Sequence, residues 1–129
     1  MSIQISVVML GVRDVARAAA FYVDGLGAKV VQQYPGFVRC RLSEGSADLA
    51  MYEWDAVADD IGVALEGSGF RGVALHYLPD SRSEVDEVMR RAQAAGATVV
   101  RPAGTTEWGG YDGTFEDLDG HLWKVATDA

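Results

Sequence analysis

The 129-residue sequence predicts an α+β fold built from two copies of one βαβββ module. Two internal similarities lead to this prediction. The segment Gly27 to Val31 (GAKVV) recurs as Gly96 to Val100 (GATVV), and Val7 to Asp14 (VVMLGVRD) aligns with Val73 to Asp80 (VALHYLPD). A repeat of about half the chain indicates two supersecondary units that cannot bury their apolar faces alone. We therefore expect one domain made of two paired modules, with a functional crevice between them.

The first module is expected to span residues 1–54. Ile3 to Val12 is rich in β-branched and apolar residues, which is typical of a strand. Asp14 suits the N-cap of a helix from Val15 to Val23, which Gly25 and Gly27 would end. Three strand-like segments follow, separated by glycine-containing turns: Ala28 to Gln33, Phe37 to Leu42 and Asp48 to Trp54.

The second module, residues 70–129, repeats this order after a linker at residues 55–69. The linker is acidic and contains glycine, with room for one helical turn. A capping box, Ser81-x-x-Glu84, opens a helix from Arg82 to Ala95, and Asp117 to Gly120 forms a hairpin turn. The expected strands are Gly72 to Leu78, Thr98 to Arg101, Tyr111 to Glu116 and His121 to Ala126.

Composition excludes several classes of function. Hydrophobic residues make up 49% of the chain and charged residues 23%, which is typical of a soluble globular domain. The net charge of -8 argues against a nucleic-acid or anionic-membrane partner, because such partners need clustered cations. No apolar run approaches the roughly 20 residues that span a bilayer. The single cysteine, Cys40, cannot form an internal disulfide and is expected to be buried and inert, and the N-terminus lacks a signal-peptide pattern. A cytoplasmic location is therefore expected.

Several short motifs, taken together in this order, resemble those of the vicinal oxygen chelate superfamily. They are Val12 to Arg17 (VRDVAR), Phe21-Tyr22, Gly25 to Gly27 (GLG), Trp108 to Tyr111 (WGGY) and Asp119 to Trp123 (DGHLW). The superfamily includes glyoxalase I, extradiol dioxygenases and metal-free bleomycin-binding proteins. The resemblance covers essentially the whole chain and implies a curved mixed sheet with helices outside, a concave pocket within, and a homodimer. It does not imply one reaction.

The resemblance also indicates where metal-dependent members hold their ion. Their four ligands, usually His, Gln or Glu, come from the first and last strand of each module. In this sequence the corresponding residues are Val7, Ala50, Val73 and Lys124. Aliphatic side chains and an ammonium group cannot hold a divalent cation, so we expect no metal and no cofactor. The alternative is a metal-dependent lyase, isomerase or dioxygenase with a rearranged ligand set, drawn from His121, His76, Glu53, Glu107 or Asp112.

Strand alternation then predicts the residues that line the pocket. Phe37, Arg39 and Arg41 share one strand face, opposite Val38 and Cys40. The same reasoning directs Tyr77 inward and His76 under the helix, and the glycines of the WGGY segment suggest an aromatic lid. The predicted ligand-binding residues are Arg39, Arg41, Tyr52, Tyr77, Trp108, Tyr111 and Lys124.

Each of these residues also has a structural interpretation. The arginines could belong to a solvated strand face or a dimer rim, and the tyrosines to the core. Lys124 could form an ion pair with Asp48 or Asp112, or act as an acid or base. The sequence thus favours a metal-independent small-molecule-binding protein of the glyoxalase/bleomycin-resistance type, whose ligand is apolar or aromatic and carries an anionic group. Whether it also catalyses a reaction stays open.

Overall fold

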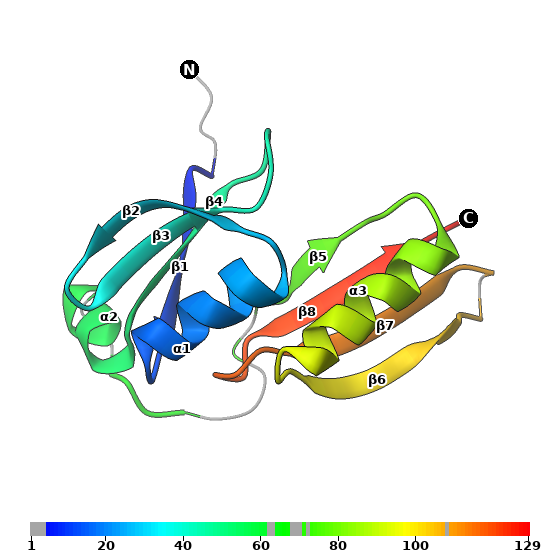
Figure 1. Ribbon diagram of the computed structural model, residues 1–129. Helices are drawn as coiled ribbons and strands as arrows, with labels where there is room; N and C mark the ends of the chain where they lie inside the picture. Colours follow the sequence, from blue (N-terminus) through cyan, green and yellow to red (C-terminus); the bar gives the residue numbers. More distant parts are fainter. Residues whose placement is uncertain (1–4, 62–63, 68–70, 72, 108) are drawn as a thin grey trace, which may run out of the picture. The chain divides into compact units, whose positions relative to one another are not determined.

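Each half of the chain builds its own four-stranded sheet, with a helix packed on one face (Figure 1). The computed structural model describes residues 5–61, 64–67, 71, 73–107 and 109–129. The chain divides into two units, residues 1–67 and 68–129. This boundary falls inside the segment 55–69 that the sequence predicts as a linker, and each unit contains one predicted module.

The two sheets have the same topology, as the repeat predicts. In each sheet the first strand of the unit lies parallel to the last strand, and the two remaining pairs are antiparallel. The first sheet runs in the order β1 (Val7–Val12), β4 (Asp48–Glu53), β3 (Phe37–Arg41) and β2 (Lys29–Tyr34). The second runs in the order β5 (Leu75–Tyr77), β8 (Leu122–Thr127), β7 (Tyr111–Glu116) and β6 (Thr98–Thr105).

Both predicted helices begin at their predicted caps. The Asp14 carboxylate accepts a hydrogen bond from the Arg17 amide at 3.0 Å at the start of α1 (Val15–Ala20), which continues as the π-helical turn η1 (Phe21–Gly25). Ser81 Oγ accepts from the Glu84 amide at 3.2 Å at the start of α3 (Arg82–Ala94). These caps satisfy amides that have no partner inside the helix.

The predicted linker is wrong in one respect, because it contains an eight-residue helix, α2 (Trp54–Ile61), which packs against β1 and β4. Asp55, Asp59 and Asp60 make the segment acidic, yet Trp54, Val57 and Ala58 recur at helical spacing. The strand predicted to end at Trp54 therefore ends at Glu53.

Two strands of the second unit also differ from expectation. β6 continues past Pro102 to Thr105. An edge strand tolerates proline because an outward-facing amide on its free side does not donate to a neighbouring strand. β5 covers Leu75–Tyr77 only, whereas the sequence predicts a strand from Gly72, a residue outside the described part of the chain. Of the helices in the described residues, none is both long and apolar enough to span a bilayer.

In each unit the core lies between the sheet and its helix. In the first unit, Val38 and Cys40 of β3 and Leu49 and Met51 of β4 are buried, as their alternation predicts. In the second unit, buried apolar residues of α3 pack over buried residues of the central strands β7 and β8. The helix residues are Val85, Met89 and Ala92, and the strand residues are Phe115, Trp123 and Val125. The opposite face of the first sheet carries Asp48 and Ala50, which are also buried.

Cys40 is buried in this core and is expected to be unreactive. Burial, aided by the nearby Asp48 carboxylate, raises the pKa of its thiol to about 11. Because the thiolate is the reactive species, Ellman's reagent should label the native protein far more slowly than protein unfolded in urea. Rapid stoichiometric labelling of the folded protein would contradict this expectation.

Candidate functional site

The face of the first sheet opposite α1, which we call the open face, brings together three predicted ligand-binding residues; the start of α2 packs on this face beside Gly11. Strand pairing places Phe37 of β3 opposite Tyr52 of β4, and Arg39 opposite Ala50. Arg41 lies on the same side of β3, because alternate residues of a strand point to the same face. Arg39, Arg41 and Tyr52 therefore share one surface, as the sequence predicts.

Aromatic rings form a row at one end of this open face. The Phe37 ring lies 6.0 Å from the ring of Tyr34 and 6.0 Å from that of Tyr52, measured between centroids. Tyr34 is 58% exposed, and its hydroxyl accepts a hydrogen bond from the Gln32 side chain at 3.0 Å. The row offers a flat apolar surface to a ligand.

Positive charge lies at the other end of the same face, held by one buried carboxylate. Asp48 is 3% exposed, and its two oxygens accept from Arg39 Nε at 2.8 Å and Arg41 Nε at 3.1 Å. Hydrogen bonds from Arg41 and Arg39 lower the pKa of this carboxyl group, and the bond to Asp48 raises the pKa of Arg41. Asp48 therefore stays ionised at neutral pH.

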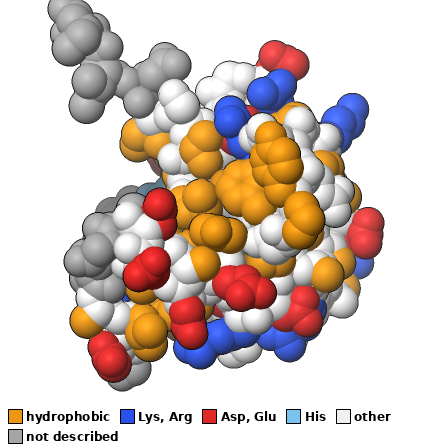
Figure 2. Space-filling model, turned by 90° about the vertical axis from the view of Figure 1, so that its left-hand side faces the viewer, with side chains coloured by type: hydrophobic (Ala, Val, Ile, Leu, Met, Phe, Trp, Pro, Cys, Tyr) orange, Lys and Arg blue, Asp and Glu red, His pale blue; other side chains and the backbone are white. Residues whose placement is uncertain are grey.

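The space-filling view shows hydrophobic side chains gathered on one face of the molecule, with Lys and Arg side chains close beside them (Figure 2). Two residues along a strand span roughly 7 Å. Since Phe37 and Arg39 are two residues apart on β3, the aromatic row and the arginines lie within reach of one small ligand.

The second unit places Lys124 in a comparable ion-pair group. Lys124 Nζ lies 3.4 Å from Asp112 Oδ2, and Arg101 Nη2 donates to Asp112 Oδ1 at 2.7 Å. Of the two partners the sequence offers for Lys124, the structure selects Asp112. The ion pair with Asp112 is the structural interpretation that the sequence offers for Lys124.

Lys124 also lines a depression of about 800 Å³ in the second unit, together with Thr106, Gly109, Gly110 and Tyr111. The depression thus joins two predicted ligand-binding residues, Lys124 and Tyr111. Among the described residues, its lining includes the carboxylates of Asp80, Asp112 and Asp128. An anionic group is therefore less well matched here than on the open face of the first unit.

The predicted directions of Tyr77 and His76 are wrong. β5 pairs with β8 so that His76 lies beside Lys124 and Tyr77 beside Val125, a core residue. Tyr77 therefore lies on the helix side of its sheet, where its hydroxyl donates to the Glu84 carboxylate of α3. This bond raises the pKa of Tyr77. A slip of one residue in register exchanges the two faces of a strand.

Tyr111 is anchored rather than part of a free lid. Its hydroxyl donates to Asp86 of α3 at 2.6 Å, and the Arg82 guanidinium lies 5.2 Å from its ring centroid. Arg82 also donates to the Gly109 carbonyl at 3.2 Å. The other aromatic residue of the predicted lid, Trp108, lies outside the described residues.

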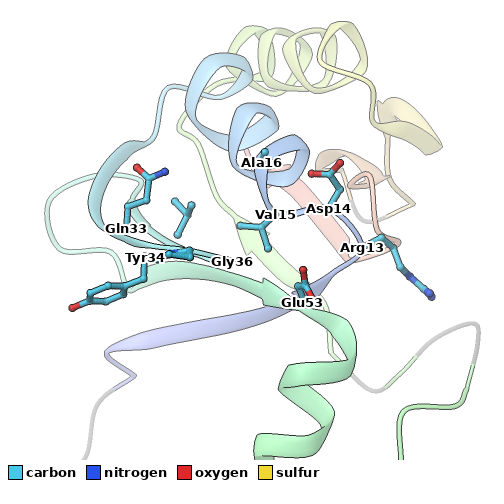
Figure 3. A pocket seen from close by; sticks show the side chains of 10 residues that line it. Arg13, Asp14, Val15, Ala16, Gln33, Tyr34, Gly36 and Glu53 are labelled. Atoms are coloured by element: carbon cyan, nitrogen blue, oxygen red, sulfur yellow. The ribbon is translucent and has the colours of Figure 1, made fainter.

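A second depression, of about 710 Å³, lies in the first unit between the start of α1 and the β2–β3 hairpin. Its lining includes Val15, Gln33 and Glu53, and Val15 points into it while Arg13 and Tyr34 point away (Figure 3). Among the described residues it contains none of those predicted to bind a ligand.

Comparison with known proteins gives the family. The sequence profile of the Glyoxalase/Bleomycin resistance protein/Dioxygenase superfamily matches residues 4–125. The chain belongs to this superfamily. None of the curated proteins compared with the chain matches it.

Solved structures of the superfamily share the fold. A glyoxalase-related enzyme from Fulvimarina pelagi is 32% identical, with a TM-score of 0.82 over 96% of this chain and 87% of that one. A glyoxalase/bleomycin resistance protein/dioxygenase family enzyme from Burkholderia phytofirmans PsJN is 21% identical, with a TM-score of 0.84 over 98% of this chain and 100% of that one. A lactoylglutathione lyase from Agrobacterium tumefaciens is 21% identical, with a TM-score of 0.68 over 96% and 92% of the two chains. The last two show the fold alone.

The residues at the superfamily's ligand positions do not fit a divalent metal ion. Val7 and Ala50 lie on the open face of the first sheet, where β1 pairs with β4. Val73 is 67% exposed, and Lys124 is paired with Asp112. The aliphatic side chains have no lone pair, and the ammonium group that pairs with Asp112 would repel a cation. No group of three or more His, Cys, Asp and Glu side chains suited to a metal occurs within the described ranges.

The residues of the alternative ligand set are dispersed or engaged elsewhere. Asp112 is shared by Arg101 and Lys124, Glu53 lines the depression beside α1, and His76 and Glu107 are exposed. The His121 amide donates to Asp117 in the hairpin turn, which is the structural role expected of that segment.

Sequence reasoning missed Tyr34 and Lys29 as members of the open face. β2 pairs with β3 so that Tyr34 lies opposite Phe37 and Lys29 opposite Arg41. A bulge between Val30 and Gln32 shifts this register. Since a bulge breaks strict alternation, the sequence carried no simple signal for these two residues.

Proposed function

We propose that the chain is a small-molecule-binding protein that needs no metal ion and takes an apolar or aromatic ligand with an anionic group. The observation that carries the proposal is the open face of the first sheet, where the row of Tyr34, Phe37 and Tyr52 adjoins Arg39 and Arg41. Ring surface supplies affinity through apolar burial, and the guanidinium groups supply orientation.

Metal independence is supported by the donor chemistry of the chain. The family's ligand positions hold three aliphatic residues and one ammonium group, so the ligand's oxygens must be bound by protein donors. Membership of the superfamily is compatible with this, because one fold hosts both binding proteins and enzymes.

Two fluorescent probes test the proposal. N-phenyl-naphthylamine is apolar and neutral, and anilinonaphthalene sulfonate has the same rings with one added sulfonate. Both should bind, and Phe37→Ala should weaken the binding of both by about tenfold. Full burial of a phenylalanine side chain contributes about 1.5–3 kcal/mol, and a loss of about 1.4 kcal/mol of binding free energy weakens affinity tenfold. Val100→Ala removes a 54% exposed apolar side chain from β6 in the other unit and should change neither affinity.

The same titrations are repeated after chelation and after addition of Ni, Co, Zn or Fe ions. We expect unchanged probe affinities and no stoichiometric metal binding by calorimetry. Failure of both probes to bind, or probe binding that requires a metal, would overturn the proposed function. The second result would favour the metal-dependent alternative.

A further inference from the structure

Two arginines hold one buried carboxylate on the open face, and a lysine lies beside them on the neighbouring strand. Arg39 and Arg41 share Asp48, and Lys29 of β2 lies opposite Arg41. Directly paired residues of antiparallel strands point to the same side, so Lys29 adds its charge to the same surface. In a chain of net charge -8, this is a local excess of positive charge.

The hydrogen bonds to Asp48 leave the outer ends of the arginines available. Each Asp48 oxygen accepts one Nε–H, and Oδ2 also accepts a hydrogen bond from Arg41 Nη2 at 3.5 Å, so Nη1 is the outer nitrogen of Arg41 that Asp48 does not engage. Within the described residues, the Nη groups of Arg39 have no other hydrogen-bonding partner. The side chains of Arg39 and Arg41 are 34% and 48% exposed, so these donors are accessible to a ligand.

The charges on this face are unbalanced. Two guanidinium groups held by one carboxylate carry a net charge of +1, and they repel each other where they converge. Glu44 acts on Arg41 at longer range. A second anion would offset the repulsion and accept the Nη donors, and guanidinium groups match anions with two or more terminal oxygens.

We infer that Arg39 and Arg41, with Lys29 beside them, form a binding site for an oxyanion, and that Asp48 positions both arginines. The acidic group of the ligand is then a carboxylate, sulfonate or phosphate attached to an apolar or aromatic body. This inference rests on the proposed function, since it names the chemical class that the same face accepts.

Competition on the unmodified protein tests the inference first. Inorganic sulfate should displace anilinonaphthalene sulfonate, whereas sodium chloride at the same ionic strength should displace it much less. Sulfate should not displace N-phenyl-naphthylamine, which has no anionic group. Equal effects of sulfate and chloride would show general screening and overturn the oxyanion site.

The double variant Arg39→Lys/Arg41→Lys keeps both charges but removes the planar donors. It should weaken the sulfonate probe about ten- to a hundredfold, as expected for lost hydrogen bonds to a charged group, and leave the neutral probe unchanged. Lys29→Met should weaken the sulfonate probe alone by a smaller factor. An unchanged sulfonate affinity in the folded double variant would overturn the role of the arginines.

The variant Asp48→Asn distinguishes two effects of Asp48: its positioning of the two arginines and its negative charge. Charge alone predicts tighter anion binding, because the variant removes a negative charge from the face. We expect weaker sulfonate binding with the neutral probe unaffected, since the arginines lose their shared anchor. Tighter binding would overturn the role of Asp48. Circular dichroism checks folding, and the sulfate competition decides the oxyanion site if the variant does not fold.

These outcomes are distinct from failure of the proposed function. If neither probe binds, the function itself is wrong. If both bind equally well and neither responds to sulfate, the apolar face binds ligands but the oxyanion site is wrong.

Discussion

Replacing Phe115 by alanine is expected to lower the free energy of unfolding by about 3–5 kcal/mol. Phe115 lies in β7, a central strand of the second sheet, and is 1% exposed. Its ring stacks on Trp123 of β8 with centroids 6.1 Å apart and planes 5° apart. Truncation therefore removes both the transfer free energy of the ring and an aromatic contact, and it leaves a cavity that the rigid sheet cannot fill.

Urea denaturation followed by tryptophan fluorescence and circular dichroism measures this loss. Val100→Ala is the control in the same unit, because Val100 is 54% exposed on the edge strand β6. Its effect should stay within about 0.5 kcal/mol. A Phe115→Ala loss below about 1 kcal/mol would show that this side chain is not a central part of the core.

Replacing Tyr22 by alanine should destabilise the first unit by a similar amount, about 3–5 kcal/mol. Tyr22 is fully buried in η1, and its ring meets the ring of Phe21 edge to face at 4.9 Å. η1 directly follows α1, which packs on β3 and β4. Loss of this side chain therefore weakens the helix layer on the side of the sheet opposite the proposed binding face.

Hydrogen exchange locates the effect of Tyr22→Ala along the chain. Protection should fall most in α1, η1 and the strands of the first sheet. Tyr34→Ala is the matched control, since Tyr34 is 58% exposed in the same unit, and its effect on stability should be below about 1 kcal/mol. If both tyrosine variants lose equal stability, burial does not explain the contribution of Tyr22.

Local sequence signals predicted most of the fold. The repeat gave the order of strands and helices in both units, and Asp14 and Ser81 marked the two helix starts. A cap is formed by residues three apart, so a short stretch of sequence contains all of its partners. The alternation in β3 likewise separated Val38 and Cys40 from Arg39 and Arg41, because a strand's period of two is local.

The candidate site was predicted only in part, because its arrangement depends on contacts between strands and not on local signals. Arg39, Arg41 and Tyr52 were named from the sequence, but their arrangement around Asp48 depends on the pairing of β3 with β4. The error at Tyr77 and His76 has a related cause. β5 is three residues long, and only its pairing with β8 decides which face each residue takes.

The sequence by itself therefore determined the repeated module, the helix starts and the superfamily. The tertiary structure decided which carboxylate each cation shares: Asp48 for the two arginines, and Asp112 for Lys124 and Arg101. The physical reason is one of range. Caps and alternation act between near neighbours, whereas strand register and ion pairing join residues from separate strands and are set only when those strands meet.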